Sequence, residues 1–324
     1  MLHGTADPRR PSSWTPLRSQ LSPEYIDWCL GILGKHYRFI TLEDAVDILE
    51  GKKPPVDYGL VLTFDDGYRS NIEDGLPVCR RHGAPMTVFI TVSNVEDRKP
   101  MWVDRIDYSL QFKAGEARVF NINGKVFDFQ SSDRDELRCV YARFRQTIKE
   151  KLTDEKEFVS KIDEIAEHLE RSSGKKLADI FEEDPWSAIL RWDEIVKVQS
   201  KEVSFGSHTI DHFRVANLQR DMLEYQFKKS KAMIEEQTRS LCKYIAFPDD
   251  SYSVAAAQIA RECGYRAAVT TNEGLNRIGS DVMLLKRFSL PVTSDPAKLL
   301  ADISGFSKAV LKLFNLANKQ PMNN

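Results

Sequence analysis

The sequence lacks three features that would each point to a particular class of protein. Its five cysteines are scattered, odd in number and never arranged as C-x-x-C, which disfavours both a disulfide framework and a cysteine-ligated zinc site. It has no run of about 18 apolar residues and no apolar segment of signal-peptide length in residues 1–20, so neither a transmembrane segment nor a secretory leader is predicted. Lys and Arg number 46 and Asp and Glu 48, and the net charge of −2 offers no basic field for a nucleic acid partner.

These absences predict a protein with reduced thiols that is cytoplasmic as its sequence is written. A signal sequence upstream of Met1 stays open as an alternative, because Met1-Leu2-His3 has the pattern of the last residues of a strand. At 324 residues the chain is long enough for one barrel-sized domain with an insertion or for two ordinary domains. The oligomeric state is not determined by any of these features.

An apolar run from Leu60 to Phe64 ends in two adjacent carboxylates and a glycine. Such a run predicts a buried parallel strand that carries Asp65 and Asp66 at its carboxyl end, the edge at which α/β barrels keep their catalytic groups. Successive residues of a strand point to opposite faces, and Gly67 lets the backbone turn directly behind the two acids. One carboxylate can therefore hold a metal ion while the other accepts a proton.

The order of the predicted elements indicates a parallel α/β sheet that is interrupted once. Residues 1–94 alternate between strands and helices, which is typical of a parallel sheet, and residues 191–324 resume this pattern and end in closing helices. Residues 95–190 are predicted to form an insertion at the mouth of the barrel, with a hairpin around Asn123-Gly124 and two charged helices. A structural cap and a part of the functional site are equally compatible with this segment.

Two histidines follow another predicted strand, Val203 to Gly206. His208 and His212 stand four residues apart, a spacing that places both imidazoles on one side of a helical turn and lets them bind one ion. The alternative is one capping and one core histidine. Because the carboxyl ends of parallel strands share one rim of a barrel, we expect the pair beside Asp65 and Asp66. Two imidazoles and a carboxylate suit Zn²⁺ or another first-row divalent ion and leave positions open for water and substrate.

Together, Thr63-Phe64-Asp65-Asp66-Gly67 and Ser207-His208-Thr209-Ile210-Asp211-His212 resemble the first two motifs of the polysaccharide deacetylases, carbohydrate esterase family four with its NodB-homology domain. Arg69-Ser70-Asn71 and Trp192-Asp193-Glu194-Ile195 are similar to the branch that acts on bacterial exopolysaccharides. The resemblance implies a distorted (β/α)7 barrel with a mostly helical insertion. It also implies a metal-dependent hydrolase of non-peptide C–N bonds that removes acetyl groups from sugars. By position, Asp65 is implied as general base, and Asp66, His208 and His212 as ligands of Zn²⁺, with Co²⁺, Ni²⁺, Fe²⁺ and Mn²⁺ as alternatives.

Two departures from the family pattern concern the proton donor and the oxyanion site. The family's late histidine is missing, because no histidine follows His212. Some exopolysaccharide deacetylases resemble circular permutants in which the strand carrying that histidine opens the domain. His3 is therefore the candidate general acid, with a disordered terminal histidine as the alternative. In the turn after Phe247, Asp249 and Asp250 replace the family's Tyr and Gly, and two carboxylates are unfavourable beside a developing negative charge.

Arg287 resembles the strand arginine that pairs with the catalytic aspartate in relatives, a role that would keep Asp65 ionised. A plain surface arginine is the alternative. The expected function is removal of acetyl groups, N-acetyl groups above all, from a sugar polymer or its lipid-linked precursor, so the expected partner is an acetylated carbohydrate. Two alternatives stay open: an amidohydrolase acting on a small C–N bond substrate, and a catalytically weak carbohydrate-binding barrel.

Overall fold

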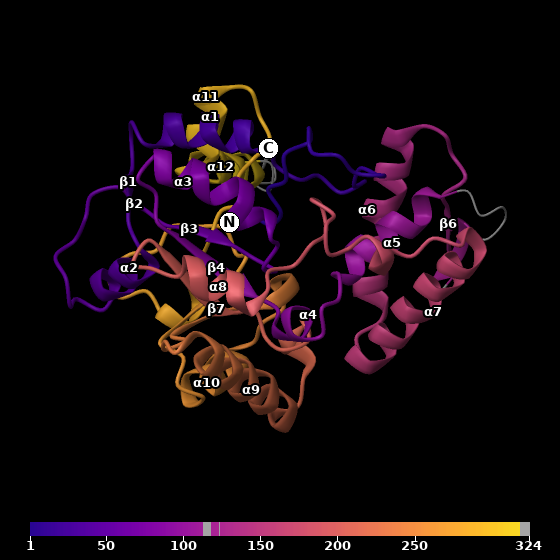
Figure 1. The fold of residues 1–324 in the computed structure, drawn as a ribbon. Coiled ribbons are helices and arrows are strands. Elements are labelled where there is room, and N and C mark those ends of the chain that lie inside the picture. The colour runs from indigo at the N-terminus through magenta and orange to yellow at the C-terminus, as the bar shows by residue number, and fades with distance from the viewer. Residues whose placement is uncertain (113–117, 123, 318–324) are drawn as a thin grey trace, which may run out of the picture.

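Five short parallel strands form the main sheet of the computed structural model, which describes residues 1–112, 118–122 and 124–317 (Figure 1). Their spatial order is β3-β4-β7-β8-β9, and nearly all of their side chains are buried. Burial on both faces is typical of a parallel sheet that is covered by helices. The strands are β3 (Leu62–Phe64), β4 (Met86–Ile90), β7 (Val203–Ser207), β8 (Tyr244–Ala246) and β9 (Ala267–Val269).

Two further segments continue this sheet at its edges and curl it into a barrel. At one edge, Leu2 pairs in parallel with Phe64 of β3, and at the other Leu285 pairs in parallel with Val269 of β9. The chain that follows Leu285 then meets the first residue, because Met1 N donates to Phe288 O at 2.7 Å and Leu290 N donates to Met1 O at 3.1 Å. The hydrogen bonds thus close around the whole ring.

The closed ring confirms the predicted α/β class and the distorted (β/α)7 barrel. Helices surround it, and many of them begin at a side chain that accepts a backbone N–H, such as Ser22 before α1 and Thr41 before α2. A two-stranded parallel pair, β1 (Arg38–Phe39) and β2 (Gly59–Leu60), lies outside the ring. The surrounding helices are α1 (Pro23–Leu33), α2 (Leu42–Leu49), α3 (Leu76–Arg81), α4 (Val92–Glu96), α8 (Trp192–Val198), α9 (Arg220–Thr238), α10 (Val254–Glu262), α11 (Pro296–Ile303) and α12 (Phe306–Ala317).

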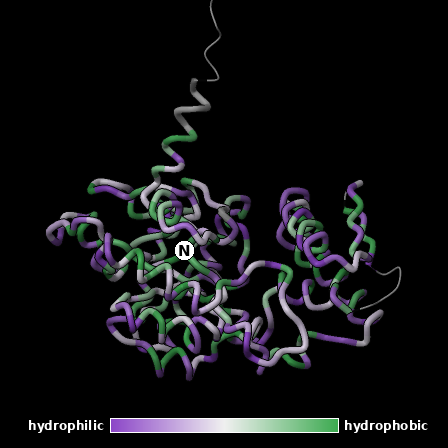
Figure 2. The backbone as a smooth tube through the Cα atoms, turned by 90° about the horizontal axis from the view of Figure 1, so that it is seen from above, coloured by the Kyte–Doolittle hydropathy of each residue, from purple (hydrophilic) through white to green (hydrophobic). Residues whose placement is uncertain are grey.

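The segment between α4 and α8 forms a second body beside the barrel, which we call the inserted block (Figures 1 and 2). Its hairpin pairs Val119 with Asp128 and Ile122 with Lys125; Asn123, predicted in its turn, lies outside the described residues. The block has its own apolar core, separate from that of the barrel. Its elements are α5 (Trp102–Gln111), β5 (Val119–Ile122), β6 (Lys125–Asp128), α6 (Arg134–Lys151) and α7 (Glu155–Ser173).

The segment that follows β-paired Leu2 crosses from the barrel to the inserted block, where it appears in indigo in Figure 1. Leu17 belongs to the apolar core of the block, and its N–H donates to Asp107 of α5 at 2.8 Å. Arg18 forms an ion pair with the fully buried Asp104 at 2.8 Å. Across the described residues, no helix is both long and apolar enough to cross a bilayer.

Candidate metal centre and catalytic site

The two adjacent carboxylates lie at the carboxyl end of β3, where Asp65 is 2% exposed and Asp66 is 5% exposed. The backbone turns sharply behind them, with φ of 75° at Asp66 and 85° at Gly67. Position 67 requires glycine, because a Cβ there would lie 2.9 Å from Cγ2 of Ile90 on the neighbouring strand β4. The turn allows the two carboxylates to reach different partners.

His208 and His212 lie in a loop after β7 and not on the helical turn predicted from their spacing. That prediction is wrong because Thr209 and His212 adopt left-handed backbone, with φ of 67° and 57°. The fully buried Gln226 of α9 holds the loop, since its Oε1 accepts the Ile210 N–H at 3.0 Å. The two imidazoles nevertheless lie close together, with their ring centroids 4.8 Å apart.

Asp66, His208 and His212 converge on one point at the mouth of the barrel. Oδ1 of Asp66 lies 3.6 Å from Nε2 of His208 and 3.5 Å from Nε2 of His212. Nδ1 of His208 lies 2.8 Å from the Ala246 carbonyl oxygen, a contact that holds the proton on Nδ1 and leaves the Nε2 lone pair facing Asp66. Two imidazole nitrogens and a carboxylate oxygen fit a first-row divalent ion such as Zn²⁺.

The protonation states of Asp66 and His208 favour cation binding, whereas that of His212 opposes it. Burial and the neighbouring His212 lower the pKa of His208 to about 4, so its imidazole is neutral near pH 7. Burial works against the charge of Asp66, but the hydrogen bond with His212 and the nearby histidine charges hold the pKa of this carboxyl below its usual range. Burial likewise disfavours a charged His212, but the hydrogen bond with Asp66 raises the pKa of His212. An incoming divalent ion would therefore compete with a proton on His212.

Asp65 does not join this cluster, because its carboxylate is bound by Arg287. The two guanidinium nitrogens Nη1 and Nη2 lie 2.8 Å from Oδ1 and Oδ2, and Nε donates to the Thr270 carbonyl oxygen at 2.9 Å. Arg287 is only 8% exposed, so it is not a plain surface arginine. Burial alone would raise the pKa of Asp65, but the Arg287 charge lowers it below the usual range.

His3 lies at the same rim as the acid pair. The Leu2 carbonyl oxygen accepts the Asp65 N–H at 2.9 Å, which sets the following residue beside the two acids. Although burial raises the pKa of both Asp65 and Asp66, the charge of His3 is among the neighbours that lower the pKa of each. Its side chain is exposed, so it is accessible to a substrate at the mouth.

The turn after β8 brings Asp249 to this rim as well. Asp249 has left-handed backbone, with φ of 54°, as do Asp66, Thr209 and His212, and such strained residues gather at functional sites. Burial opposes its charge, but His212 and Lys149 lower the pKa of Asp249. Lys149 of α6 donates to Oδ1 of Asp249. The side chain of Asp250 lies outside what the structure describes.

The motifs did not point to three of the side chains that support this site. Gln226 holds the histidine loop, Lys149 reaches the rim from the inserted block, and Arg214 joins the loop to that block through Glu155. Arg214 follows His212 by two residues, which is the one local hint in the sequence. The partners of all three come from distant segments, so spacing within a motif cannot reveal them.

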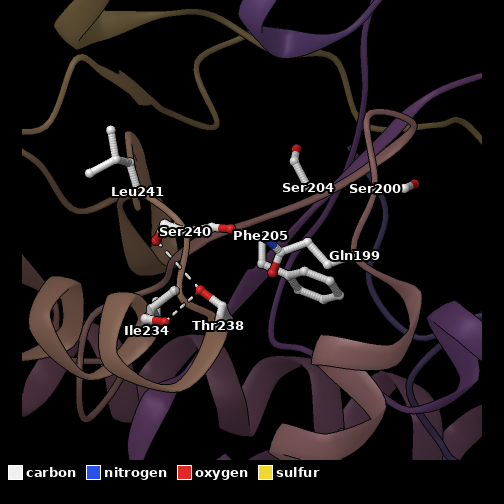
Figure 3. Close-up of a pocket in the computed structure, with 8 residues that line it drawn as sticks. All are labelled: Gln199, Ser200, Ser204, Phe205, Ile234, Thr238, Ser240 and Leu241. Carbon is white, nitrogen blue, oxygen red and sulfur yellow. Dashed lines mark hydrogen bonds between the residues drawn. The ribbon is translucent and has the colours of Figure 1, made fainter.

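A small pocket at the other end of β7 is separate from this site (Figure 3). It lies between the start of β7 and the end of α9, near Phe205 and Thr238. None of its eight lining residues is ionisable. It therefore offers no group for acid–base chemistry or for binding a cation, and the candidate site remains the opposite rim.

Comparison with known proteins identifies the family. The family model described as "Polysaccharide deacetylase" matches residues 52–268, which is more than half of the chain. The chain belongs to the polysaccharide deacetylase family. This membership confirms the resemblance carried by the acid and histidine motifs. The matched range spans the part of the chain that contains Asp65, Asp66, His208 and His212.

One curated relative matches a short stretch of the sequence, and two solved structures share the fold at low sequence identity. YxkH of Bacillus subtilis strain 168, named as a polysaccharide deacetylase, is 35% identical over 54 residues, which are 17% of this chain and only 19% of YxkH. The Streptococcus pyogenes deacetylase PplD superimposes with a TM-score of 0.58 and 17% identity, covering 94% of this chain and 96% of PplD. IcaB from Ammonifex degensii gives a TM-score of 0.56 and 17% identity, covering 93% of this chain and 94% of IcaB.

Proposed function

We propose that this polysaccharide deacetylase family member is a metal-dependent hydrolase that removes acetyl groups, N-acetyl groups above all, from a sugar polymer or its lipid-linked precursor. The observation that carries the proposal is the convergence of Asp66, His208 and His212 beside an ionised Asp65 at one rim of the barrel. Within the part of the chain that the structure describes, the cluster comprises three side chains, which is the number that a catalytic ion takes while it keeps a position open.

Asp65 is assigned as the general base. Asp66, His208 and His212 would hold a divalent ion, which would supply Lewis-acid chemistry for the acetyl carbonyl and for the attacking water. Asp65 accepts the proton from the attacking water, while its bidentate contact with Arg287 holds the carboxylate ionised and oriented. Zn²⁺ is the proposed native ion, and Co²⁺, Ni²⁺, Fe²⁺ or Mn²⁺ would suit the same donors.

His3 is assigned as the general acid. Breaking the C–N bond leaves an amine that needs a proton. Leu2 pairs with Phe64, so His3 follows on the segment next to β3 and its exposed imidazole is available beside the acid pair. The assignment places base and acid on neighbouring backbone segments. It also gives a function to the N-terminal segment around Met1 and Leu2, which lies between β3 and Leu290 in the ring.

An acetyl group is the part of the substrate best supported. PplD is described as a deacetylase in complex with acetate, and its fold spans 94% of this chain. Acetate is the product that the proposed reaction would release here. The sugar, its linkage and its polymer length are chosen by residues beyond the metal cluster.

The test uses protein from which a chelator has removed all metal. It measures acetate release from N-acetylated glucosamine oligosaccharides before and after addition of Zn²⁺ or Co²⁺. We expect release only with the metal, and its loss in Asp65→Asn, which should still bind the ion. Release of product from a small cyclic amide in place of the sugar would favour the amidohydrolase alternative. Equal inertness of wild type and Asp65→Asn, with the ion bound to both, would overturn the proposal in favour of a carbohydrate-binding barrel.

A further inference from the structure

The inserted block reaches the candidate metal centre through one charged side chain. Lys149, in the last turn of α6, donates to Oδ1 of Asp249 on the turn after β8. Its side chain is 28% exposed and that of Asp249 is 16% exposed, so the pair is largely shielded from water. A shielded charge is screened less than a surface charge, and the pair therefore affects its neighbours.

The ammonium group of Lys149 is held in place by an aromatic pair as well as by Asp249. It lies 5.7 Å from the ring centroid of Trp102 on α5, within the range of a cation–π contact. The Trp102 ring packs edge-on against Phe158 of α7, with the centroids 5.3 Å apart. The position of Lys149 is thus set by the inserted block itself.

Arg214 joins the same end of the block to the histidine loop. Its Nε donates to Glu155 Oε1 at 2.6 Å, its Nη2 donates to the Leu152 carbonyl oxygen at 2.5 Å, and Nη1 donates to the carbonyl oxygen of Lys149. The guanidinium also covers the Phe158 ring at 4.5 Å. Because Arg214 follows His212 by two residues, the position of Lys149 and that of the histidine loop are mechanically linked.

The pair lies beside the metal cluster. Asp249 follows Ala246 by three residues, and the Ala246 carbonyl oxygen lies 2.8 Å from Nδ1 of His208. The Lys149 carbonyl oxygen accepts a hydrogen bond from Arg214, two residues after His212. Asp249 alone would add a negative charge to a site that already holds Asp66. An extra negative charge attracts a cation more strongly but opposes the negative charge that develops on the acetyl oxygen during hydrolysis.

We propose that Lys149 of the inserted block neutralises Asp249 and so sets the charge of the metal centre, a role that rests on the proposed deacetylase function. Lys149 acts on the metal centre only through its ion pair with Asp249, so it is a positioning residue and not a catalytic one. The inserted block is then part of the functional site and not only a cap. The site favours turnover over the tightest possible metal binding.

The experiment compares Lys149→Met, Asp249→Asn and the double variant with the wild type, using Co²⁺ titration of the chelated protein and kcat for acetate release. In Lys149→Met we expect Co²⁺ to bind about fivefold more tightly and kcat to fall about tenfold, two changes of opposite sense that follow from one unpaired carboxylate. In the double variant, the Co²⁺ affinity and kcat should both return to within about twofold of the wild type, because Asp249→Asn removes the carboxylate that Lys149→Met leaves unpaired. Lys149→Arg should retain both values.

Lys151→Met is the matched control, since Lys151 is an exposed lysine at the end of the same helix. It should leave Co²⁺ affinity and kcat unchanged, and thermal unfolding checks that every variant is folded. Unchanged Co²⁺ affinity in Lys149→Met, or a double variant as slow as Lys149→Met, would overturn the proposal. If the wild type releases no acetate, the deacetylase assignment fails and the Co²⁺ titration alone still decides the role of Lys149.

Discussion

The barrel and the inserted block contribute to the site in different ways. The barrel supplies short side chains directly after its strands, as with Asp65 and Asp66 after β3 and His208 after β7, and backbone pairing sets their positions. The inserted block supplies long side chains that cross the gap between two bodies, as Lys149 does from α6. Backbone hydrogen bonds between strands therefore fix the site residues of the barrel. The positions of the site residues of the inserted block depend instead on how the cores of the two bodies pack together.

This difference predicts which changes abolish the chemistry and which only adjust it. A short, buried side chain on a strand end has no replacement if it is removed, because nothing else can reach its position. A long side chain at the rim contributes mainly its charge, and a charge acts over a distance. Variants of the barrel half should consequently have larger effects on activity than variants of the inserted block.

The largest effect is expected from His208→Gln in the barrel half. The change removes an imidazole nitrogen from the cluster, so the chain should lose most of its affinity for Zn²⁺ or Co²⁺ and activity should fall at least about 10³-fold. Metal content after dialysis and the rate of acetate release measure the two effects. His82→Gln is the control, because His82 pairs with Asp27 at 2.9 Å outside the site. Full activity of His208→Gln would remove the metal cluster from the mechanism.

A somewhat smaller loss is expected from Arg287→Met. Arg287 holds the pKa of Asp65 below its usual range, so without it this pKa rises and the acid limb of the pH–kcat profile moves to higher pH. We expect kcat to fall about 10²-fold near neutral pH. Arg287→Lys should restore part of the activity and shift the acid limb back. An acid limb that stays in place while kcat falls would show that Arg287 does not act through Asp65.

His3→Asn should slow the reaction in a manner that depends on the leaving group. If His3 protonates the departing amine, the variant should lose about 30-fold in kcat on an N-acetyl sugar and little on a phenyl acetate, whose phenolate leaves without a proton. The ratio of the two rates is the measurement. Equal losses on both substrates would contradict the role of general acid. His36→Asn, at a surface helix end, is the control.

The smallest effect on activity is expected from Asp107→Asn in the inserted block. Burial raises the pKa of Asp107 to about 7, so the folded protein keeps this carboxyl protonated where the unfolded chain has lost the proton. The folded state then binds more protons between about pH 4 and pH 7, and the free energy of unfolding falls as the pH rises through this window.

The difference in unfolding free energy between wild type and Asp107→Asn should change by up to about 4 kcal/mol between pH 4 and pH 8, given about 1.4 kcal/mol for each pKa unit. Urea unfolding at the two pH values measures it. Asn keeps an acceptor for the Leu17 N–H, so the variant should fold and retain its kcat. A large loss of kcat would mean that the block and the barrel are coupled more tightly than their separate cores indicate.

Much of the barrel half could be predicted from local pattern. Of the apolar run from Leu60 to Phe64 that was predicted as one strand, only Leu62–Phe64 form β3, with the acids at its carboxyl end, because Leu60 pairs with β1 in the separate strand β2. The strand before His208 forms β7, and parallel pairing through β4 brings the two ends to one rim. These features follow from the pattern of apolar residues along the sequence and from the geometry of parallel strands, both of which are properties of short stretches of chain.

The conformation of the histidine loop could not be predicted in the same way. Four-residue spacing suggested a helical turn, but Gln226 of α9 binds the loop backbone, in which Thr209 and His212 are left-handed. A side chain that lies on another element decides the backbone here. Local spacing therefore predicted that the imidazoles meet, while their geometry depended on a tertiary contact.

By itself, the sequence determined which side chains the barrel places at its rim, because strand ends and short motifs carry that information locally. Only the tertiary structure decided how the ring closes through Met1 and Leu290 and how Asp249 acquires Lys149 as its partner. These contacts join residues that are far apart in the chain, and their energy depends on burial and on the packing of two cores. No local pattern of residues specifies such a pairing.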